Sequence, residues 1–300
     1  MGADAALFPG FERRSVEGAG ATIACVVGGN GPPVLLLHGY PQTHAMWHRV
    51  APELARTRTV VAADLRGYGD SSKPASGDTH AAYSKRAMAA DMVAVMRKLG
   101  HARFDLVGHD RGGRVSHRLA ADHPEAVRRV AVLDIAPTYA MYTKTDLAFA
   151  TAYYHWFFLI QPNGLPERLI GSDPDGYLKT KIGGWGSEGT SFFDPRALDE
   201  YLRCYRDPAT IHATCEDYRA SASIDLEHDA ADRAAGRRLG MPLLALWGER
   251  NRVTGELFDT LAEWREVAVD VRGGPVASGH YLAEEAPEAT LAALRPFLDD

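Results

Sequence analysis

The sequence lacks any apolar run of about 18 residues, the length that a membrane-spanning helix requires. Its first eight residues contain no basic segment followed by an apolar one, so no secretory signal is expected. There is no run of Lys or Arg, and 33 basic against 39 acidic residues give a formal net charge of −6. Nucleic acids and anionic membranes need broad basic surfaces, so we expect neither as a partner. Because no membrane span and no secretory signal are expected either, we predict a cytoplasmic protein. Taken alone, the acidic balance also argues mildly against an anionic ligand.

Cysteine is scarce as well. The three cysteines, Cys25, Cys204 and Cys215, are odd in number and widely separated, and no metal-ligand spacing links them. We therefore expect reduced thiols in the core and no metal site.

The remaining composition is ordinary for a globular protein, with 46% hydrophobic and 24% charged residues. The length of 300 residues exceeds the usual ~100–200 residues of one domain. We therefore expect one large domain, or a domain that carries an insertion.

The hydrophobic pattern predicts strands that alternate with helices. Residues 11–28 alternate apolar and polar positions around a turn at 17–20, which predicts an opening β-hairpin. Short runs that are apolar on both faces are typical of buried parallel strands; they occur at residues 34–37, 60–63, 104–107, 130–133 and 243–247, and a last strand is expected at 267–271. Helical segments are expected at residues 81–99, 111–122 and 286–298. This alternation predicts an α/β fold, a mostly parallel central sheet flanked by helices.

One long segment interrupts the alternation. Residues 139–235 contain no run typical of a strand, only aromatic-rich and helical stretches joined by loops. We predict a helical cap domain at 139–235, inserted into a core domain formed by residues 1–138 and 236–300. Such a cap would cover the carboxyl edge of the sheet, where ligands of open α/β folds bind.

The sharpest local motif is Gly-His-Asp-Arg-Gly at residues 108–112, between a predicted strand and a predicted helix. It has the form of a nucleophile elbow, a tight turn between glycines that lifts one side chain above the sheet. The lifted residue is Asp110. Asp at this place can also be an ordinary helix N-cap.

Two further segments complete a catalytic arrangement around Asp110. The loop at residues 38–41 follows the first buried strand, where the backbone N–H of Tyr40 can form an oxyanion hole with that of Arg111. His280 follows the last strand and can lie over the elbow as the base. The expected acid after residues 243–247 is replaced by Asn251, so Asp134, at the end of the preceding strand, is the candidate that orients His280.

These motifs span most of the chain and resemble the α/β-hydrolase fold. Within it they resemble the branch with an aspartate nucleophile: haloalkane dehalogenases, epoxide hydrolases and haloacetate dehalogenases. A carboxylate suits displacement at a saturated carbon, because it leaves an alkyl ester that water can hydrolyse. Haloalkane dehalogenases usually place Trp after the nucleophile, whereas this chain has Arg111, and Arg114 lies on the same helix face. Two guanidinium groups can bind a substrate carboxylate.

The motif at 108–114, the loop at 38–44 and the aromatic stretch at 154–158 most closely resemble the haloacetate dehalogenases that act on fluoroacetate. The resemblance implies that His155, Trp156 and a cap tyrosine bind the halide, and Tyr218 is our choice among Tyr153, Tyr154, Tyr201, Tyr205 and Tyr218. It also suggests a homodimer. His38 and Trp185 are candidates for lining the pocket.

The sequence therefore predicts a cofactor-free hydrolase of short 2-haloacids, with a small anionic haloacid as its substrate. Asp110 would displace the halide, and His280, oriented by Asp134, would activate water against the resulting ester. One alternative is an epoxide hydrolase with the same Asp and His, which needs two cap tyrosines at the epoxide oxygen and leaves the arginine pair without a task. Another is a non-catalytic small-ligand receptor on the same fold, which would need no complete triad.

Overall fold

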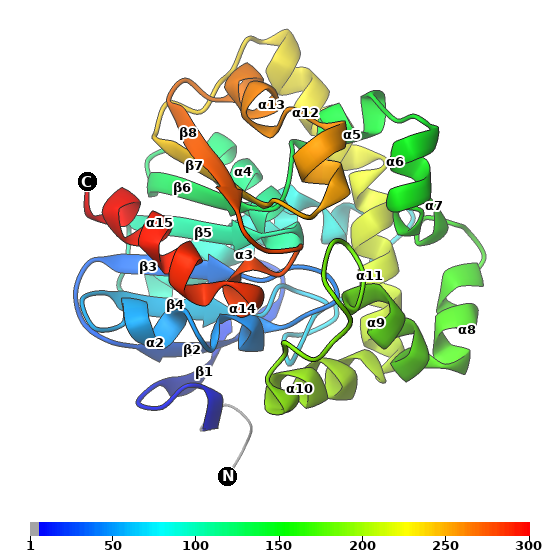
Figure 1. The fold of residues 1–300 in the computed structure, drawn as a ribbon, viewed down its shortest axis with the longest axis horizontal. Helices are drawn as coiled ribbons and strands as arrows, with labels where there is room; N and C mark the ends of the chain where they lie inside the picture. Colours follow the sequence, from blue (N-terminus) through cyan, green and yellow to red (C-terminus); the bar gives the residue numbers. More distant parts are fainter. Residues whose placement is uncertain (1–5) are drawn as a thin grey trace.

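The computed structural model describes residues 6–300. Residues 1–5, part of the N-terminal segment in which no secretory signal is expected, lie outside the described residues. Within that range the chain forms one eight-stranded sheet in the order β1-β2-β4-β3-β5-β6-β7-β8 (Figure 1). Its strands are β1 Glu12–Glu17, β2 Thr22–Gly28, β3 Pro33–Leu37, β4 Thr59–Ala63, β5 Phe104–His109, β6 Val127–Leu133, β7 Leu243–Gly248 and β8 Val271–Val276. The predicted hairpin is the antiparallel pair β1–β2, β2 pairs antiparallel with β4, and the strands from β4 to β8 in this order are parallel. The predicted α/β fold is confirmed.

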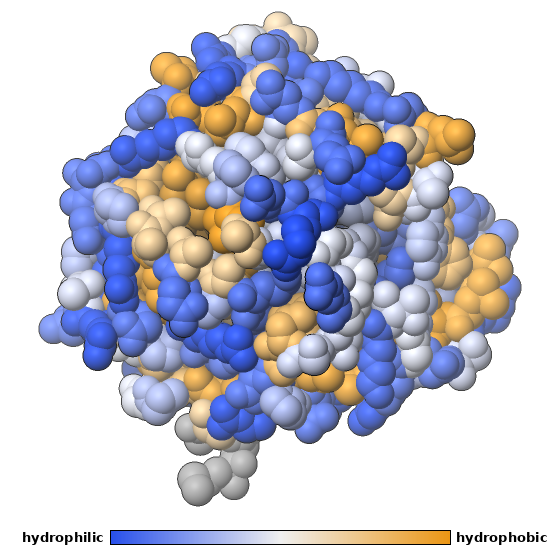
Figure 2. All heavy atoms as spheres, viewed as in Figure 1, coloured by the Kyte–Doolittle hydropathy of each residue, from blue (hydrophilic) through white to orange (hydrophobic). Residues whose placement is uncertain are grey.

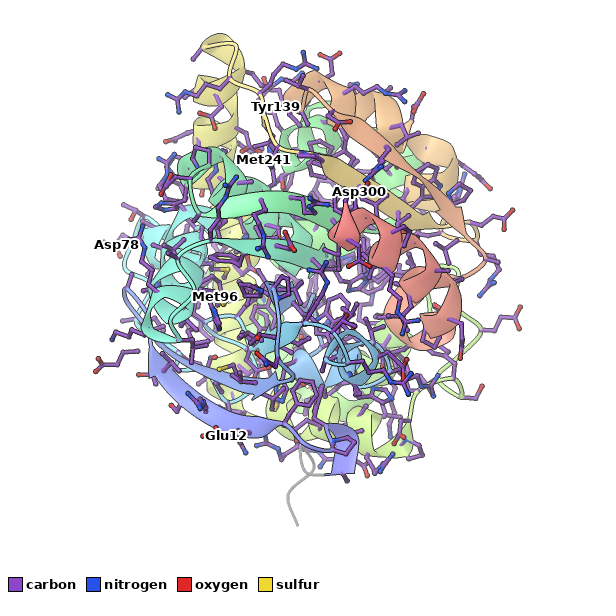
Figure 3. All side chains as sticks on the ribbon, turned by 90° about the vertical axis from the view of Figure 1, so that its left-hand side faces the viewer. Glu12, Asp78, Met96, Tyr139, Met241 and Asp300 are labelled. Atoms are coloured by element: carbon purple, nitrogen blue, oxygen red, sulfur yellow. The ribbon has the colours of Figure 1, made fainter. Side chains whose placement is uncertain are left out.

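Helices cover both faces of the sheet. On one face lie α3 Lys85–Lys98 and α4 Arg111–Asp122, and on the other lies α15 Pro287–Asp299, as Figure 3 shows in side view. Shorter elements connect the strands: η1 His44–Trp47, α2 Ala51–Leu54, η2 Ala81–Tyr83, η3 Val253–Leu257, α13 Thr260–Val267 and α14 Leu282–Glu285. Residues 34–37 of β3 and 104–109 of β5 are buried throughout, because helices pack on both faces of these central strands.

The last predicted strand is wrong in position. Val267 ends α13, and β8 begins only at Val271. The apolar residues of α13 pack inward as a helix, with Trp264 fully buried and Asp259 capping the first turn. The true strand has the sequence Val-Arg-Gly-Gly-Pro-Val and pairs only with β7, so it is an edge strand without the apolar run of a central strand.

Between β6 and β7 the described chain is helical: α5 Thr138–Thr143, α6 Leu147–Ala152, α7 His155–Phe158, α8 Leu165–Ser172, α9 Pro174–Ile182, α10 Pro195–Tyr205, α11 Pro208–Ser221 and α12 Ile224–Ala234. We call α5 to α12 the cap helices. They lie along the right side of Figure 1, beside the carboxyl ends of β3, β5 and β6. The exact boundaries of the two domains stay predictions.

The helix α11 is the innermost cap helix. Every residue from Thr210 to Ser221 is buried except His212. It packs against α8, α10, α12 and the core element η2, so no face of it is left to solvent along most of its length. Side chains of α11 therefore reach the region above the sheet.

No helix in residues 6–300 is long and apolar enough to cross a membrane. The face in Figure 2 is mainly hydrophilic with small scattered apolar areas. Cys25, Cys204 and Cys215 are free and buried, and burial raises the pKa of the Cys25 thiol to about 12. The thiols are therefore protonated and unreactive at neutral pH.

Candidate active site

Asp110 stands at a strained turn between β5 and α4. Its backbone has φ 46° and ψ −113°, a conformation that residues other than glycine rarely adopt. The turn also requires glycine on both sides: a Cβ at Gly108 would lie 2.4 Å from the carbonyl oxygen of Gly112, and one at Gly112 would lie 2.4 Å from that of His38. The strand, the two glycines and the helix together hold the carboxylate of Asp110 above the sheet.

The loop after β3 lies directly against this carboxylate. The backbone N–H of Tyr40 donates to Asp110 Oδ1 at 2.9 Å. A Cβ at Gly39 would lie 2.4 Å from Asp110 Cβ, so only glycine permits this approach. The other predicted donor, the N–H of Arg111, belongs to the first turn of α4, where N–H groups have no intrahelical partner.

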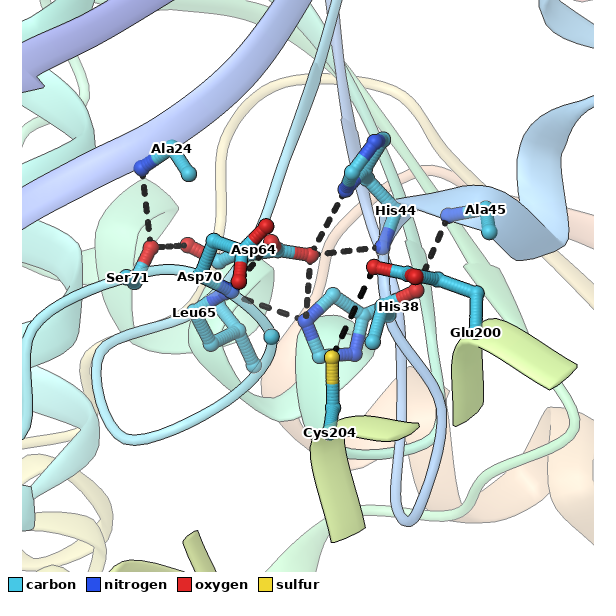
Figure 4. Close-up of polar contacts among 12 residues, drawn as sticks. Ala24, His38, His44, Ala45, Asp64, Leu65, Asp70, Ser71, Glu200 and Cys204 are labelled. Atoms are coloured by element: carbon cyan, nitrogen blue, oxygen red, sulfur yellow. Dashed lines mark hydrogen bonds and ion pairs between the residues drawn. The ribbon is translucent and has the colours of Figure 1, made fainter. Parts of the chain in front are cut away.

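His38 supports this loop through its backbone contacts. Its Nε2 accepts from the N–H of Leu65 at 3.0 Å, and its Nδ1 donates to the carbonyl of Gly39 at 2.9 Å. Behind it, Asp64 accepts from the N–H groups of His44 and Asp70 and ties the loop after β4 to the loop after β3 (Figure 4). Both ring nitrogens of His38 are thus engaged by backbone groups, so the ring has no nitrogen left for a ligand.

His280 and Asp134 form the second part of the arrangement. His280 Nδ1 donates to Asp134 Oδ2 at 2.5 Å. Asp134 also accepts from the N–H of Gly248 at 2.9 Å, from Thr254 Oγ1 at 2.6 Å and from Asn251 Nδ2 at 2.5 Å. The amide that replaces the expected carboxylate after β7 therefore orients Asp134. Neither Asn251 nor Thr254 was singled out as a supporting donor from the sequence, because neither lies near Asp134 along the chain.

The charges in this buried pair favour a nucleophilic carboxylate beside a basic imidazole. Burial alone would raise the pKa of Asp110, but the charges of His280, Arg114 and Arg111 outweigh it and lower that pKa. Burial alone would lower the pKa of His280, but the hydrogen bond and charge of Asp134, together with Asp110, raise it above its ordinary value. Asp110 is thus ionised at neutral pH, and His280 is stabilised when it takes up a proton.

Arg111 is fixed by a carboxylate of the cap. Its Nε and Nη2 bind the two carboxylate oxygens of Asp217 at 2.9 and 2.6 Å, and Nη2 also contacts Ser221 Oγ. Lys85 Nζ and Tyr68 Oη bind the same carboxylate. These contacts occupy all of the guanidinium except Nη1, which is buried and has no hydrogen-bond partner in the described part of the chain.

Arg114 shows the same pattern with different partners. Its Nη1 donates to the carbonyl of Ala136 at 3.1 Å and to Thr138 Oγ1 at 2.9 Å, and Nη2 lies 3.2 Å from Met141 Sδ. Within residues 6–300 its buried Nε has no partner. Each arginine therefore offers one unpartnered nitrogen rather than a two-nitrogen fork. Burial and the positive charge of Arg111 lower the pKa of Arg114. An anion bound between the two guanidinium groups would offset this repulsion.

Three cap residues bring further donors to the same place. Trp156 packs under Arg114, whose Cζ lies 4.6 Å from its ring centre, and Tyr218 lies 4.1 Å from Cζ of Arg111. The ring centre of His155 lies 5.7 Å from that of Tyr218 and 6.0 Å from that of Tyr40. Trp156 Nε1, Tyr218 Oη and His155 Nδ1 are all buried, and none has a hydrogen-bond partner among the described residues.

The protonation states of these groups suit an anion as well. Burial and the charge of Asp110 raise the pKa of Tyr218 well above its ordinary value, so its hydroxyl keeps its proton. Burial and the charge of Lys181 hold the pKa of His155 well below the ordinary value, so its ring is neutral. A neutral imidazole still carries one N–H.

The other cap tyrosines considered from the sequence have hydroxyls with a hydrogen-bond partner or, for Tyr154, a side chain that is partly exposed. Tyr153 accepts from Asn251, Tyr201 donates to Glu284, and Tyr205 pairs with Tyr40. Tyr154 is 47% exposed. The buried hydroxyl of Tyr142 also lacks a partner in the described residues and its ring lies 4.8 Å from that of Trp156; the sequence reasoning missed it because nothing marks it apart from other cap tyrosines.

Trp185 lies between the cap and the base. Its ring centre is 4.8 Å from that of His155 and 5.1 Å from that of His280, and its carbonyl accepts from the N–H of His280. Beside it, burial lowers the pKa of Lys181 to about 8, and Lys181 Nζ stands 5.7 Å from the Trp185 ring centre. Trp185 is partly exposed, which fits a residue at the edge of an otherwise closed site.

The structure thus brings the predicted residues into one buried group. Asp110 lies close enough to His280 and both arginines to feel their charges, and each arginine lies against a ring of the cap. Among residues 6–300 no cluster of three or more potential metal ligands occurs. Residues 32–281 match a family model described as the alpha/beta hydrolase fold.

The chain belongs to the α/β-hydrolase family. It is 50% identical to a fluoroacetate dehalogenase of Burkholderia sp over 294 residues, 98% of this chain and 96% of that protein. It is also 34% identical to a soluble epoxide hydrolase of Corynebacterium sp., over 88% of each chain. The solved structure of a candidate α/β hydrolase from Nostoc sp PCC 7120 is 58% identical, covers 96% of this chain and 98% of its own, and superimposes with a TM-score of 0.94. The predicted resemblance to the haloacetate dehalogenase branch of this family is confirmed.

Proposed function

We propose that this α/β hydrolase cleaves carbon–halide bonds of short 2-haloacids, converting haloacetate, including fluoroacetate, and water into glycolate and halide. The observation that carries the proposal is the group of buried donors without partners among the described residues. Two belong to arginines, Arg111 Nη1 and Arg114 Nε, and the others belong to the cap residues Trp156, Tyr218 and His155. A buried donor without a partner costs about 1–3 kcal/mol. One small substrate with a carboxylate at one end and a halogen at the other would satisfy both sets.

In the first step Asp110 acts as the nucleophile. Arg111 and Arg114 each donate one hydrogen bond to the substrate carboxylate, which holds the α-carbon against the carboxylate of Asp110. An oxygen of Asp110 forms a bond to this carbon while the carbon–halogen bond breaks, and the halide leaves with the bonding electron pair. Fluoride is a poor leaving group, so donors from Trp156, Tyr218 and His155 must stabilise the charge as it develops.

In the second step His280 acts as the general base. It takes a proton from water, and the hydroxide attacks the carboxyl carbon of the Asp110 ester. The N–H groups of Tyr40 and Arg111 stabilise the resulting oxyanion. Collapse breaks the ester C–O bond, and the proton on His280 passes to the departing alkoxide to give glycolate. The second water proton, left on the new Asp110 carboxyl group, passes to solvent and restores the carboxylate. Asp134 keeps the imidazole oriented and stabilises its protonated form.

An epoxide hydrolase is the competing proposal, and relatives with that name exist. Such an enzyme needs two tyrosine hydroxyls at the epoxide oxygen. Tyr218 supplies one, and Tyr153, whose hydroxyl accepts from Asn251, still has its own O–H to donate. The two unpartnered arginine nitrogens, however, would have no role with a neutral epoxide. That observation favours the haloacid.

A non-catalytic receptor on this fold needs no base aimed at a strained nucleophile. Here Asp110 is held at φ 46°, and three groups besides His280 donate to Asp134 and fix its orientation under His280. Strain of this kind occurs at functional sites in general; a base held over the strained carboxylate has a task in catalysis and none in binding alone. We also propose that the enzyme acts in the cytoplasm as a homodimer; an equilibrium sedimentation measurement would test the latter.

The decisive experiment mixes excess enzyme with limiting fluoroacetate in oxygen-18 water and measures fluoride, glycolate and the peptide that contains Asp110. We expect fluoride release, unlabelled glycolate from the first turnover, and label in that peptide. Label that enters glycolate directly would contradict the ester route. Absence of fluoride, together with hydrolysis of a small epoxide, would favour the epoxide hydrolase instead.

A further inference from the structure

A cavity of about 230 Å³ lies outside the proposed active site. It is enclosed by the second half of α4, the start of α5, the end of α12 and the segment that precedes β7, in the upper part of Figure 1. Tyr139, which is labelled in Figure 3, lines it. Its lining also includes six apolar residues, Ala120, Ala121, Pro124, Pro137, Leu239 and Val267, together with His117, Gly240 and charged side chains.

The two acidic residues of this cavity, Asp229 and Asp232, are already paired with arginines. Arg118 binds Asp229 with Nη2 at 2.5 Å and Asp232 with Nη1 at 2.6 Å. Arg237 Nη1 lies 2.8 Å from the other oxygen of Asp232. Neither carboxylate is therefore available to repel an anion or to bind a cation on its own.

Arg238, which also lines the cavity, donates to the backbone carbonyls of Arg265 and Ala268. Among the described arginines of the lining, Arg233 is the one that lacks a close partner. Its Nη1 is buried and has no hydrogen-bond partner among residues 6–300. Its Nη2 stands 3.7 Å from Glu266 Oε2, which is too far for a hydrogen bond, and its Cζ lies 5.2 Å from the ring centre of Tyr139. A bound carboxylate would pair with Nη1 and remove the cost of burying an unpaired donor.

The size of the cavity limits the rest of the ligand. An engineered cavity of about 150 Å³ with apolar walls binds benzene, so about 230 Å³ leaves room for a ring and a carboxylate. We propose that this cavity is a second binding site, for a small aromatic monocarboxylate whose ring packs among the apolar residues and whose carboxylate binds Arg233.

The cavity is separated from the proposed substrate site by one segment of chain. Arg114 donates to the carbonyl of Ala136 and to Thr138 on the side of the active site. Pro137 and Tyr139, which alternate along the chain with Ala136 and Thr138, line the cavity on the other side of this segment. A ligand here would therefore pack behind Arg114 without reaching Asp110.

Isothermal titration of the full-length enzyme with benzoate tests the proposal, and benzamide serves as the uncharged probe of the same shape. We expect one benzoate per chain, with benzamide at least about tenfold weaker because it lacks the charge. Arg233→Gln should weaken benzoate binding by about tenfold or more, and Ala121→Phe should abolish it by filling the cavity. Arg237→Gln is the matched control, since its guanidinium is already paired with Asp232, and should change the affinity less than about twofold.

Three results would overturn the proposal: no benzoate binding at millimolar concentration, equal affinity for benzamide, or unchanged affinity in both Arg233→Gln and Ala121→Phe. The last result would place benzoate elsewhere, for example at the arginines of the substrate site. If Ala121→Phe does not fold, Arg233→Gln decides alone. The Arg233 side chain is one-third exposed, and replacing it leaves no buried charge without a partner, so this variant should fold. None of these measurements depends on dehalogenation, so failure here leaves the proposed reaction unaffected.

Discussion

The two sides of the active site differ in how their polar groups are satisfied. On the core side, Asp110 accepts from the backbone of Tyr40, and His280 is held by an Asp134 that has three further donors. On the cap side, Trp156 and Tyr218 are buried without hydrogen-bond partners in the described structure. The nucleophile and its base are therefore organised before any ligand arrives, as chemistry requires. The cap donors, like the free nitrogens of Arg111 and Arg114 on the core helix α4, are complementary to something that must still bind.

Arg111 joins the two sides. It begins α4 in the core, directly after the proposed nucleophile, yet Asp217 of α11 in the cap holds its guanidinium. The next cap residue, Tyr218, stacks on the same guanidinium. The position of α11 thus sets both the proposed carboxylate site and one proposed halide donor.

The largest effect should come from the core side. Asp110→Asn removes the nucleophile but preserves shape, so halide release should fall by about 10⁵-fold or more. The measurement is fluoride or bromide release from the haloacetates, with circular dichroism to establish that the variant is folded. Substantial residual release from a folded variant would mean that water attacks the substrate directly.

His280→Asn should separate the two steps. Turnover should fall by up to about 10⁴-fold because the general base is lost, while the first step still proceeds. Rapid quenching should therefore show one halide released per chain, and mass spectrometry should show Asp110 carrying a glycolyl ester. If neither the burst nor the adduct occurs, His280 does not have the role proposed for it.

On the cap side, Trp156→Phe keeps the ring but removes the N–H donor. With fluoroacetate, kcat should fall by about 100-fold, as when one transition-state donor is lost. Bromide needs less stabilisation as it leaves, so bromoacetate should be affected less. The kcat ratio of the two substrates is the readout, and an equal loss for both would argue that Trp156 acts only by packing.

The link between the two sides is tested by Asp217→Asn. Breaking this buried pair should lower the free energy of unfolding by about 3 kcal/mol, and loss of alignment in Arg111 should raise KM for haloacetate by about tenfold with a smaller change in kcat. Glu216→Gln is the matched control: it neighbours Asp217 on α11 but binds Arg219 and His80, remote from the site. A KM that rises equally in both variants would mean that only general stability matters.

The smallest effect concerns pH. The raised pKa of His280 in the free enzyme means that its base form is lost, as pH falls, at a higher pH than for an ordinary histidine. The negative charge of Asp110 contributes to this increase, and esterification removes that charge. The pKa of His280 in the ester form, given by the acid limb of ester hydrolysis in single turnover, should therefore lie below its pKa in the free enzyme, measured by NMR titration of the imidazole. Identical pKa values would contradict a close electrostatic link between the two residues.

Local patterns predicted much of the core. The elbow at 108–112, the buried strands and the helix at 111–122 are short-range features, since tight turns and apolar periodicity are set by neighbouring residues. The prediction of a strand at 267–271 was wrong because the true strand, β8, lies at the sheet edge, where glycine and proline replace the apolar run. An edge strand is stabilised by one neighbour and needs no such run.

The sequence by itself determined the α/β-hydrolase fold, the elbow that presents Asp110, and the kinds of residue available for an anionic substrate. Only the tertiary structure decided how those residues are used. Asp217 lies 106 positions from Arg111, and Asn251 lies 117 positions from Asp134, so no local pattern could have paired them. Their pairing leaves one unpartnered nitrogen on each arginine. The physical reason is burial: when solvent is excluded, each polar group needs a specific partner, and packing decides which groups retain none for the ligand.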